Sequence, residues 1–490
     1  LPIAHFIKHQ PIHPFSGTIK AHGAGTDLLA HSTTLSAAID IKALGYDKYD
    51  LSNINIKASL DNGSLTAQAN CDNKAIKGNV GMRALLSALH LGEGDKHGST
   101  VMLTANLSHI DLQKLHVIDE ATTVSVHGQV DATTDFDKLY KVQGRFSDIA
   151  VSNGRKELHP NDVTLDLLTN HDTTKVIADC NDFHLNLHSS GGYEKLMKAI
   201  VPFINEMQRQ LKDRYIDQER LRRRLPQLKV SLQTNSDNFF AQILHHYGID
   251  FKSINMDVES SPSTGINGYA EATGLVVDSM ALDTTRLNMS SAQKDMTYSL
   301  ELHNGSKSQL PFHALVDGAI TEHGTWIKPR VYDAKGRLGV GLSLMAEMKR
   351  DGINVSMFGD KPILGYKEFE VNDSNYIFLG DNRKVKANLT LTDDEGTGLQ
   401  IYSDDSNAEA LQDITLSLNK LDIGRILKVI PYAPNITGVL DGDFHVTQTK
   451  ENLSVASAID INKMTYNGCA LGNIGTELTY MPKSGGGHYV

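Results

Sequence analysis

Apolar and polar residues alternate along much of the chain, which is the pattern of a strand with one apolar face and one polar face. Residues 35–41 and 54–60 alternate in this way. Alternation resumes at 65–69, after the turn-forming residues Asp61-Asn62-Gly63, which tolerate positive φ. Residues 51–70 are therefore predicted to form a β-hairpin.

The same alternation continues toward the end of the chain. It predicts further strands at 101–107, 124–130, 183–187, 296–302, 399–401, 414–418 and 453–461. Clusters of Gly, Asn, Asp and Ser separate the runs at short intervals, which is typical of antiparallel connections. The sequence thus predicts a mainly β fold of antiparallel strands, each with one apolar face.

One stretch has the spacing of a helix. Its apolar residues recur every three or four positions, at Leu196, Ile200, Ile204, Met207, Leu211 and Tyr215. Because Pro202 cannot donate to the helix ladder, we expect a short turn and then a helix from Pro202 to about Arg224, ended by Pro226. The polar face is basic, with Arg209, Lys212, Arg214, Arg220, Arg222, Arg223 and Arg224. These cations either complement the C-terminal end of the helix dipole or contact anionic lipid or a neighbouring groove.

Two shorter helices are predicted from their capping residues and spacing. One covers 238–246, with Asp237 as N-cap and Gly248 just after its end, and the other runs from about Met82 to Leu91. The chain then divides into a β-repeat segment at 1–190, a helical insertion at 191–226 and a second β-repeat segment at 227–490.

The chain also repeats itself. A shift of 420 positions aligns residues 36–60 with 456–480 without a gap, and Ala38-Ile39-Asp40-Ile41 matches Ala458-Ile459-Asp460-Ile461. A second element, Leu-x-x-x-Asp-[Leu/Ile]-x-x-[Leu/Ile], occurs at 107–115 and at 418–426 and precedes a strand-opening Gly128 or Gly438. Repetition predicts an elongated array in which each unit buries apolar surface against its neighbours. The alternative is convergence of short amphipathic strands on a few residue types.

Composition and motifs argue against several classes of function for this chain. The net charge of −11 argues against a nucleic-acid binder, which needs a basic surface to release counterions. Three cysteines cannot form a disulfide framework, and no nucleophile elbow, zinc helix or phosphate loop occurs in the 490 residues. The histidines at 5, 9 and 13, at 184 and 188, and at 245 and 246 lack a third ligand, so no metal or other cofactor is expected. The chain is expected to be non-enzymatic.

The ends and the apolar runs bear on membrane attachment. The chain begins at Leu1 without a signal-like stretch and stops soon after Gly485-Gly486-Gly487, so we expect it to be a segment of a longer protein. Its apolar runs, such as 196–204, are too short to span a bilayer.

The repeated units resemble the TamB-type translocation and assembly module proteins of the AsmA-like superfamily, in the larger form found in Bacteroidota. The closest stretch is 414–480, where Ile-Thr-Leu-Ser-Leu-Asn-Lys-Leu-Asp-Ile-Gly-Arg-Ile-Leu leads to Ile-Thr-Gly-Val-Leu-Asp-Gly at 436–442. The resemblance extends loosely over most of the chain, and no single residue in it is diagnostic.

The resemblance implies an elongated antiparallel sheet curled into an open groove, the β-taco, that carries phospholipid acyl chains through the periplasm. It further implies a parent protein anchored in the inner membrane, whose C-terminal domain engages an outer-membrane barrel related to BamA. The anchor and that docking domain are not identifiable in this sequence, so neither role is assigned to it.

The residues expected to line the groove are the apolar alternating positions of the repeated strands. They are Leu35, Ala37, Ile39, Ile41, Ile54, Ile56, Ala58, Leu60, Val101, Leu103, Ala105, Leu107, Ile414, Leu416, Leu418, Val455, Ile459 and Ile461. Alternation alone does not distinguish a groove that solvates acyl chains from a packed core.

Two other classes remain open at this point. An extracellular β-solenoid or sandwich array for adhesion or polysaccharide binding would need aromatic platforms, and aromatic residues make up only 6% of the chain with a single tryptophan, Trp326. A β-helical polysaccharide enzyme would need paired carboxylates in one cleft, and the acidic clusters at 393–395 and 404–405 are more simply solvated loops.

Overall fold

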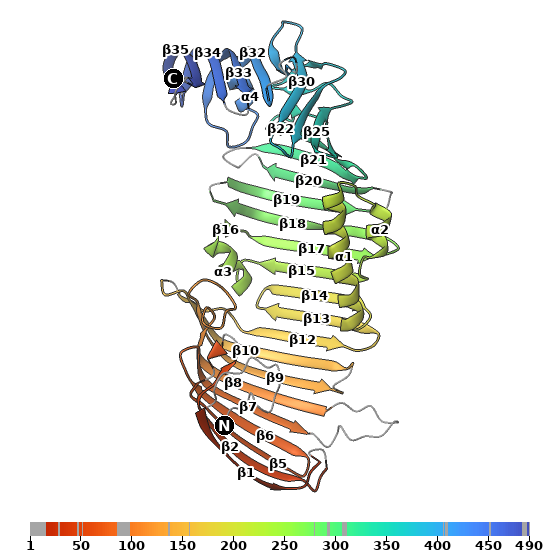
Figure 1. The fold of residues 1–490 in the computed structure, drawn as a ribbon, viewed down its shortest axis with the longest axis vertical. Helices are drawn as coiled ribbons and strands as arrows, with labels where there is room; N and C mark the ends of the chain where they lie inside the picture. The colour runs from red at the N-terminus through yellow and green to blue at the C-terminus, as the bar shows by residue number, and fades with distance from the viewer. Residues whose placement is uncertain are drawn as a thin grey trace. The chain divides into compact units, whose positions relative to one another are not determined.

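The computed structural model describes residues 16–27, 30–46, 49–50, 52–85, 99–135, 138–155, 157–278, 280–291, 295–305, 311–404, 406, 410–449, 452–482 and 488–489. Its described strands, apart from the small β3–β4 pair, form one large antiparallel sheet that is not closed into a barrel. The described part also contains four helices (Figure 1). The predicted fold class, a mainly β open antiparallel sheet with a helical insertion, is confirmed.

Two compact units make up the chain. Unit 1 comprises residues 1–199 and 226–257, and unit 2 comprises residues 200–225 and 258–490. The division differs from the three segments expected from the sequence, because the helical insertion does not form a unit of its own.

Most strands of unit 1 pair with the strand that precedes or follows them along the chain. The strands of this unit are β1 (Ser16–Ala24), β2 (Thr34–Ala43), β3 (Gly45–Tyr46), β4 (Tyr49–Asp50), β5 (Ile54–Asp61), β6 (Ser64–Asp72), β7 (Ile76–Leu85), β8 (Ser99–Asp111), β9 (Thr123–Thr134), β10 (Tyr140–Ser152), β11 (Glu157–Leu158), β12 (Val163–Thr169), β13 (Thr173–Cys180), β14 (Phe183–Ser190), β15 (Leu228–Asn235) and β16 (Ile249–Asp250).

Strand β17 (Ser253–Ser261) contains the boundary between the units, and the remaining strands belong to unit 2. They are β18 (Gly265–Val277), β19 (Met280–Ser290), β20 (Met296–Asn304), β21 (Phe312–Thr321), β22 (Gly324–Asp333), β23 (Leu338–Gly341), β24 (Leu344–Lys349), β25 (Gly352–Met357), β26 (Ile363–Leu364), β27 (Lys367–Glu368), β28 (Glu370–Val371), β29 (Tyr376–Gly380), β30 (Val385–Thr392), β31 (Gly398–Ser403), β32 (Gln412–Asp422), β33 (Ile436–Gln448), β34 (Leu453–Tyr466), β35 (Cys469–Pro482) and β36 (His488–Tyr489).

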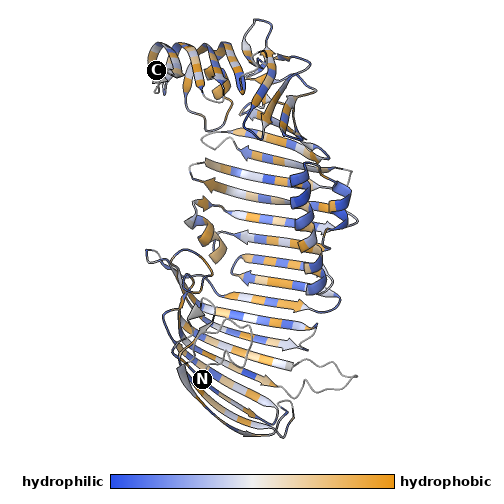
Figure 2. Ribbon diagram, viewed as in Figure 1, coloured by the Kyte–Doolittle hydropathy of each residue, from blue (hydrophilic) through white to orange (hydrophobic). Residues whose placement is uncertain are grey.

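The strands carry the alternation that predicted them. Apolar and polar residues follow one another along the strands of each unit (Figure 2). In the predicted hairpin, β5 and β6 join through Asn62 and Gly63, with φ of 46° and 70°. Two successive positive φ values are those of a type I′ turn, whose twist matches that of the strands.

The repeated sequence folds into the same hairpin twice. Leu35 pairs with Leu60 across β2 and β5, and Val455 pairs with Tyr480 across β34 and β35, so both partners are displaced by 420 positions. The second repeated element also has one geometry. A bulge follows Leu107 in β8 and Leu418 in β32. Shared register and shared bulge support true repetition over convergence.

In each copy of the second element, an aspartate caps the turn that follows the strand. Asp111 accepts a hydrogen bond from the Lys114 amide at 3.0 Å, and Asp422 accepts one from the Arg425 amide at 2.9 Å. Asp422 thereby caps the short helix α4 (Ile423–Leu427). The glycines that were expected to open the next strand lie inside it, Gly128 in β9 and Gly438 in β33.

The long helical stretch differs from the prediction at both ends. Helix α1 spans Tyr193–Asp213 with Pro202 inside it, so the helix starts well before the proline. The predicted continuation to Arg224 is interrupted at Arg214, whose φ is 56°, and a separate helix α2 (Gln218–Arg223) follows. Asp217 caps α2 through the Arg220 amide, which starts the second helix at a new angle.

Of the two short helices predicted from the sequence, one is present and one is not found where its residues are described. Helix α3 (Phe239–His246) is present, but its N-cap is Asn238, which accepts from the Ala241 amide, and not Asp237. The predicted helix at 82–91 is wrong where it is described, because residues 82–85 belong to β7 and pair with β6 and β8. Its remaining positions lie outside the described residues.

Candidate functional site

The groove candidates of unit 1 lie on one face of five neighbouring strands. Across β2, β5, β6, β7 and β8, Ala37 pairs with Ala58, Ala58 with Ala67, Ala67 with Met82, and Met82 with Leu103. Paired residues of antiparallel strands point to the same side, so each row is continuous across the sheet. The flanking rows contain the other candidates of this unit, namely Leu35, Ile39, Ile41, Ile54, Ile56, Leu60, Val101, Ala105 and Leu107.

This apolar surface, which we call the open face, is covered only in part. Ile41 and Leu60 are buried, whereas the other ten candidates on it are half-buried. Residues at the intervening positions of the same strands, such as Ser36, Lys57 and Thr66, are exposed. The open face therefore has less contact with water than the opposite face, yet most of its side chains are not enclosed.

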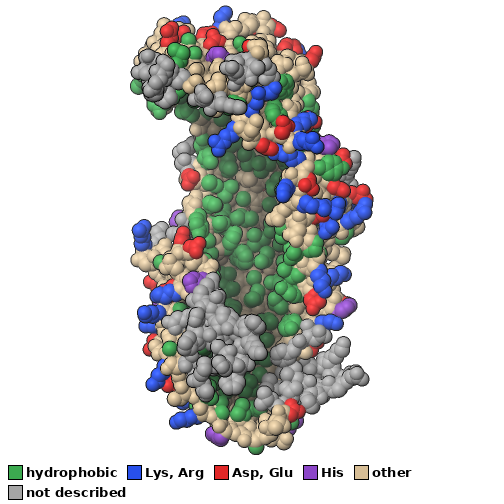
Figure 3. Space-filling model, in the orientation of Figure 1, with side chains coloured by type: hydrophobic (Ala, Val, Ile, Leu, Met, Phe, Trp, Pro, Cys, Tyr) green, Lys and Arg blue, Asp and Glu red, His purple; other side chains and the backbone are tan. Residues whose placement is uncertain are grey.

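The candidates of unit 2 also share one face. Leu418 pairs with Gly442, which pairs with Ile459, and Leu440 pairs with Ile461. The neighbouring rows contain Ile414, Leu416 and Val455. All six candidates of this unit are half-buried. In unit 1, Figure 3 shows hydrophobic side chains gathered in a hollow over β12, β13, β14 and β15.

In an earlier part of the unit 2 sequence, residues 357–399, the apolar face of the sheet is covered. Phe369, Leu389 and Leu391 are buried at 4%, 7% and 2% exposure, with Met357, Leu364, Val371, Ile377 and Leu399 packed against them. Here β28 turns back to pair with β30, which places Phe369 over the apolar side chains of that strand. We call this the closed cluster, and it is an ordinary hydrophobic core.

The basic stretch of the helices is largely neutralised by acids. Glu206 is buried at 4% exposure and forms ion pairs with Arg209, Arg220 and Arg224. A hydrogen bond from Gln210 lowers the pKa of Glu206, and a hydrogen bond from Arg209 lowers it further, although desolvation acts in the opposite direction. Glu206 thus ties α2 to α1, which favours a structural role for these three arginines over contact with anionic lipid.

Residues 200–225, which we call the helical arm, are attached to strand ends of unit 2. The Ile216 amide donates to the Glu322 carbonyl at 2.8 Å, and the Tyr215 hydroxyl donates to the Glu322 carboxylate at 2.7 Å. Gln218 donates to the Ile320 carbonyl at 3.1 Å, and Arg214 donates to the Gly352 carbonyl at 2.7 Å. These bonds hold the arm against β21 and β22 and the start of β25.

An apolar pocket of about 690 Å³ lies between the helical arm and the sheet of unit 2. Its lining includes Phe203, Met207, Leu211, Leu221 and Leu225 from the arm, and Ile266, Met296 and Ile320 from β18, β20 and β21. Sequence reasoning found the apolar face of α1 but not the pocket, because the break at Arg214 that folds α2 beside α1 was not expected.

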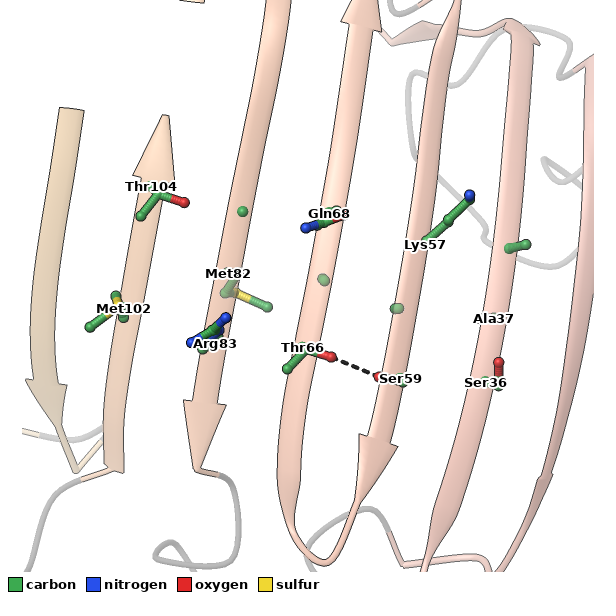
Figure 4. A pocket seen from close by; sticks show the side chains of 14 residues that line it. Ser36, Ala37, Lys57, Ser59, Thr66, Gln68, Met82, Arg83, Met102 and Thr104 are labelled. Atoms are coloured by element: carbon green, nitrogen blue, oxygen red, sulfur yellow. Dashed lines mark hydrogen bonds between the residues drawn. The ribbon is translucent and has the colours of Figure 1, made fainter. Parts of the chain in front are cut away.

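A second depression, of about 650 Å³, lies across the polar rows of β2, β5, β6, β7 and β8 (Figure 4). Lys57 and Arg83 are its charged side chains, and the Ser59 and Thr66 hydroxyls bond to each other at 2.7 Å. Without an acid or a histidine in its lining, the depression lacks a pair of groups for acid–base chemistry.

Other candidate chemistry is accounted for by local bonds. Among the described residues, no group of three or more His, Cys, Asp or Glu side chains could hold a metal ion. His184 bonds to Asp179 at 2.6 Å and His245 to Asp250 at 2.5 Å, and the histidines at 5, 9 and 13 lie outside the described residues. Asp393, in one of the acidic loops, accepts from Lys367, which lowers its pKa despite desolvation.

The cysteines are free thiols: Cys71 is half-buried on the open face, Cys180 is buried and Cys469 is exposed. Burial raises the pKa of the Cys71 thiol, which disfavours its reactive thiolate.

Within the described part of the chain, the helices are too short or too polar to cross a bilayer. Comparison with family models, curated proteins and solved structures finds no match to this chain.

Proposed function

We propose that this chain is a non-enzymatic segment of a TamB-like periplasmic protein and that its apolar faces carry phospholipid acyl chains between the inner and outer membranes. The observation that supports this most directly is the continuous set of apolar rows on the open face, whose members are mostly half-buried. An acyl chain lying on such a face would gain about 25 cal/mol for each Å² of apolar surface that it covers.

The composition of the face fits this cargo. Its central row begins with three alanines, Ala37, Ala58 and Ala67, and continues with Met82 and Leu103, so small side chains occupy three neighbouring strands and flexible or aliphatic ones the next two. Alanine methyl groups leave space above the sheet that larger side chains would fill in a core. In this proposal, the parent protein engages a separate outer-membrane barrel of the BamA family, and is anchored in the inner membrane, through parts other than this chain.

Photo-crosslinking can test the proposal without disturbing the fold. A photoreactive amino acid is placed at Leu103 on the open face, or at the adjacent Thr104 on the polar face. The variants are produced in cells as the whole parent protein. We expect phospholipid adducts at position 103, detected by mass spectrometry, and at least about tenfold fewer at position 104 because the two side chains point to opposite faces. Equal adducts at both positions, or none at either, would contradict the proposal.

Polar substitution tests whether the face is needed for transport. Ile39→Asp and Ile459→Asp should reduce lipid bound by the purified protein, because each places a carboxylate where acyl chains would lie. Ala38→Asp is the matched control, since Ala38 is exposed on the polar face opposite Lys57. Loss of lipid in all three variants would argue against a role specific to the apolar face.

A further inference from the structure

The helical arm leaves apolar side chains exposed to solvent where it borders the pocket. Met207 and Leu211 are 38% and 55% exposed, and both line the pocket beside α2. Within the arm, the Glu206 ion pairs hold α2 against α1, and the bonds to Glu322 attach the arm to the sheet of unit 2. A rigid element that keeps apolar side chains exposed beside a cavity is suited to contact an apolar ligand.

The floor of the pocket belongs to the apolar face of the sheet. Met296 pairs with Ile320 across β20 and β21, and two residues farther along β20, Tyr298 pairs with Gly318. Residues two apart on a strand point to the same face, so the pocket is continuous with the apolar rows of these strands. Its volume of about 690 Å³ lies in the ordinary range of small-ligand pockets, roughly 300–1,000 Å³.

The polar part of the lining has an uneven charge. Arg222 lines the pocket and donates to the Ser263 carbonyl, and Arg223 forms an ion pair with the lining residue Glu219. Four acids line the pocket, namely Asp217, Glu219, Asp295 and Glu322, so acids still outnumber these two cations. A guanidinium binds phosphate, and carboxylates attract an ammonium group. An anionic headgroup without an ammonium would face a net negative lining, so this pocket complements a zwitterionic headgroup.

We propose that this pocket binds one acyl chain of a phospholipid with an ammonium-bearing headgroup, such as phosphatidylethanolamine, and so selects cargo beside the apolar face of unit 2. The inference rests on the proposed transport function and adds a specific site and a headgroup preference to it. Arg222 would contact the phosphate, and Glu219 and Asp295 would contact the ammonium, since Asp217 caps α2 and Glu322 accepts from Tyr215. Met207 and Leu211 would cover the acyl chain.

Adjacent positions on α1 supply a matched pair of variants. Met207→Asp places a carboxylate in the pocket, whereas Gln208→Asp places one at an exposed position of the same helix turn. Native mass spectrometry of the purified protein, with phosphatidylethanolamine and phosphatidylglycerol of identical acyl chains in detergent micelles, measures both occupancy and preference. We expect Met207→Asp to weaken phosphatidylethanolamine binding about tenfold, or about 1.4 kcal/mol, and Gln208→Asp to leave it unchanged. Equal binding by both variants would overturn the proposal.

The headgroup preference is tested with Glu219→Gln combined with Asp295→Asn. The unmodified protein should prefer phosphatidylethanolamine about fivefold, and the double variant should lose that preference while keeping its binding of acyl chains. A preference for phosphatidylglycerol, or no preference in the unmodified protein, would overturn the assignment of the headgroup.

Crosslinking separates this inference from the proposed function. Lipid adducts from a photoreactive residue at position 207 as well as at position 103 would support both proposals. Adducts at 103 but not at 207 would overturn the pocket and leave the transport face in place. Adducts at neither position would overturn both, and adducts at 207 alone would support the pocket and contradict transport along the open face.

Discussion

The open face of unit 1 and the closed cluster of unit 2 begin from the same sequence pattern and reach different states. On β5, alternate residues from Ile54 to Ala58 are half-buried, while on β30, alternate residues from Ala387 to Leu391 are buried at 7% exposure or less. Strand pairing is antiparallel and regular in both regions. Alternation therefore decides which side chains share a face but not whether that face is covered.

The difference comes from a segment that returns over the sheet. After β25, the chain forms three strands of two residues each, β26, β27 and β28, and the Phe369 amide donates to the Pro362 carbonyl at 2.8 Å. This segment places Phe369 against Leu389 and Leu391. In the open face, the described neighbours of β5, β6 and β7 are strands of the same sheet. A face that the chain covers serves stability, whereas a face left half-covered is available to a ligand.

The largest expected contrast is in the response to a buried charge. Leu391→Asp places an unpaired carboxylate in the closed cluster and should cost more than about 4 kcal/mol of unfolding free energy, enough to unfold this region. Ile39→Asp on the half-buried open face should cost about 1–2 kcal/mol, because its carboxylate retains contact with water. Urea unfolding monitored by hydrogen exchange for each region measures both values. Similar costs at the two positions would show that the open face is a packed core.

Local parts of this fold could be predicted from the sequence because their causes are local. The hairpin at 51–70 follows from two-residue alternation and from Asn62-Gly63, which adopts positive φ easily. The grouping of the candidate residues on common faces follows from the same periodicity. The closed cluster could not be predicted, because its strands of two residues carry no periodic signal. Its burial also depends on pairing between strands that are not consecutive in the chain, β23 with β26 and β28 with β30.

The errors have equally specific causes. Residues 82–85 have apolar spacing that suits a helix as well as a strand, and hydrogen bonding to β6 and β8 decides in favour of the strand. Pro202 lies within α1 because the loss of one hydrogen bond does not outweigh the rest of a 21-residue helix. The pocket was missed because it depends on the break at Arg214 and on the cap at Asp217, which together fold α2 beside α1.

A truncation to alanine should show the same contrast at a smaller scale. Leu391→Ala removes packed methyl groups at 2% exposure and should destabilise its region by about 3 kcal/mol, because the surrounding side chains cannot fill the cavity. Leu103→Ala on the open face should cost about 1 kcal/mol, because the half-buried Leu103 side chain loses less buried apolar surface on truncation. Chemical denaturation of the two variants measures the difference. A larger loss for Leu103 than for Leu391 would reverse our assignment of open and closed regions.

The smallest expected effect concerns how the returning segment is held at acid pH. Burial alone would raise the pKa of Asp333, but hydrogen bonds from Arg337, the Lys335 amide and the Tyr366 hydroxyl outweigh it and lower the pKa from 3.8 to about 2. Tyr366 precedes β27, so this bond at 3.0 Å links the β22–β23 turn to the segment that covers the closed cluster.

Because the folded-state pKa of Asp333 is depressed, its contribution to stability is present above about pH 4 and is lost as the pH falls toward about 2. Asp333→Asn should remove about 1 kcal/mol near neutral pH, after allowance for solvent screening, and should flatten the stability of this region between pH 4 and pH 2. Hydrogen exchange of residues 363–371 against pH measures the change, with the exchange of β5 and β6 as an internal reference. If Asp333→Asn leaves the acid response of residues 363–371 unaltered, the carboxylate does not anchor the segment that closes this face.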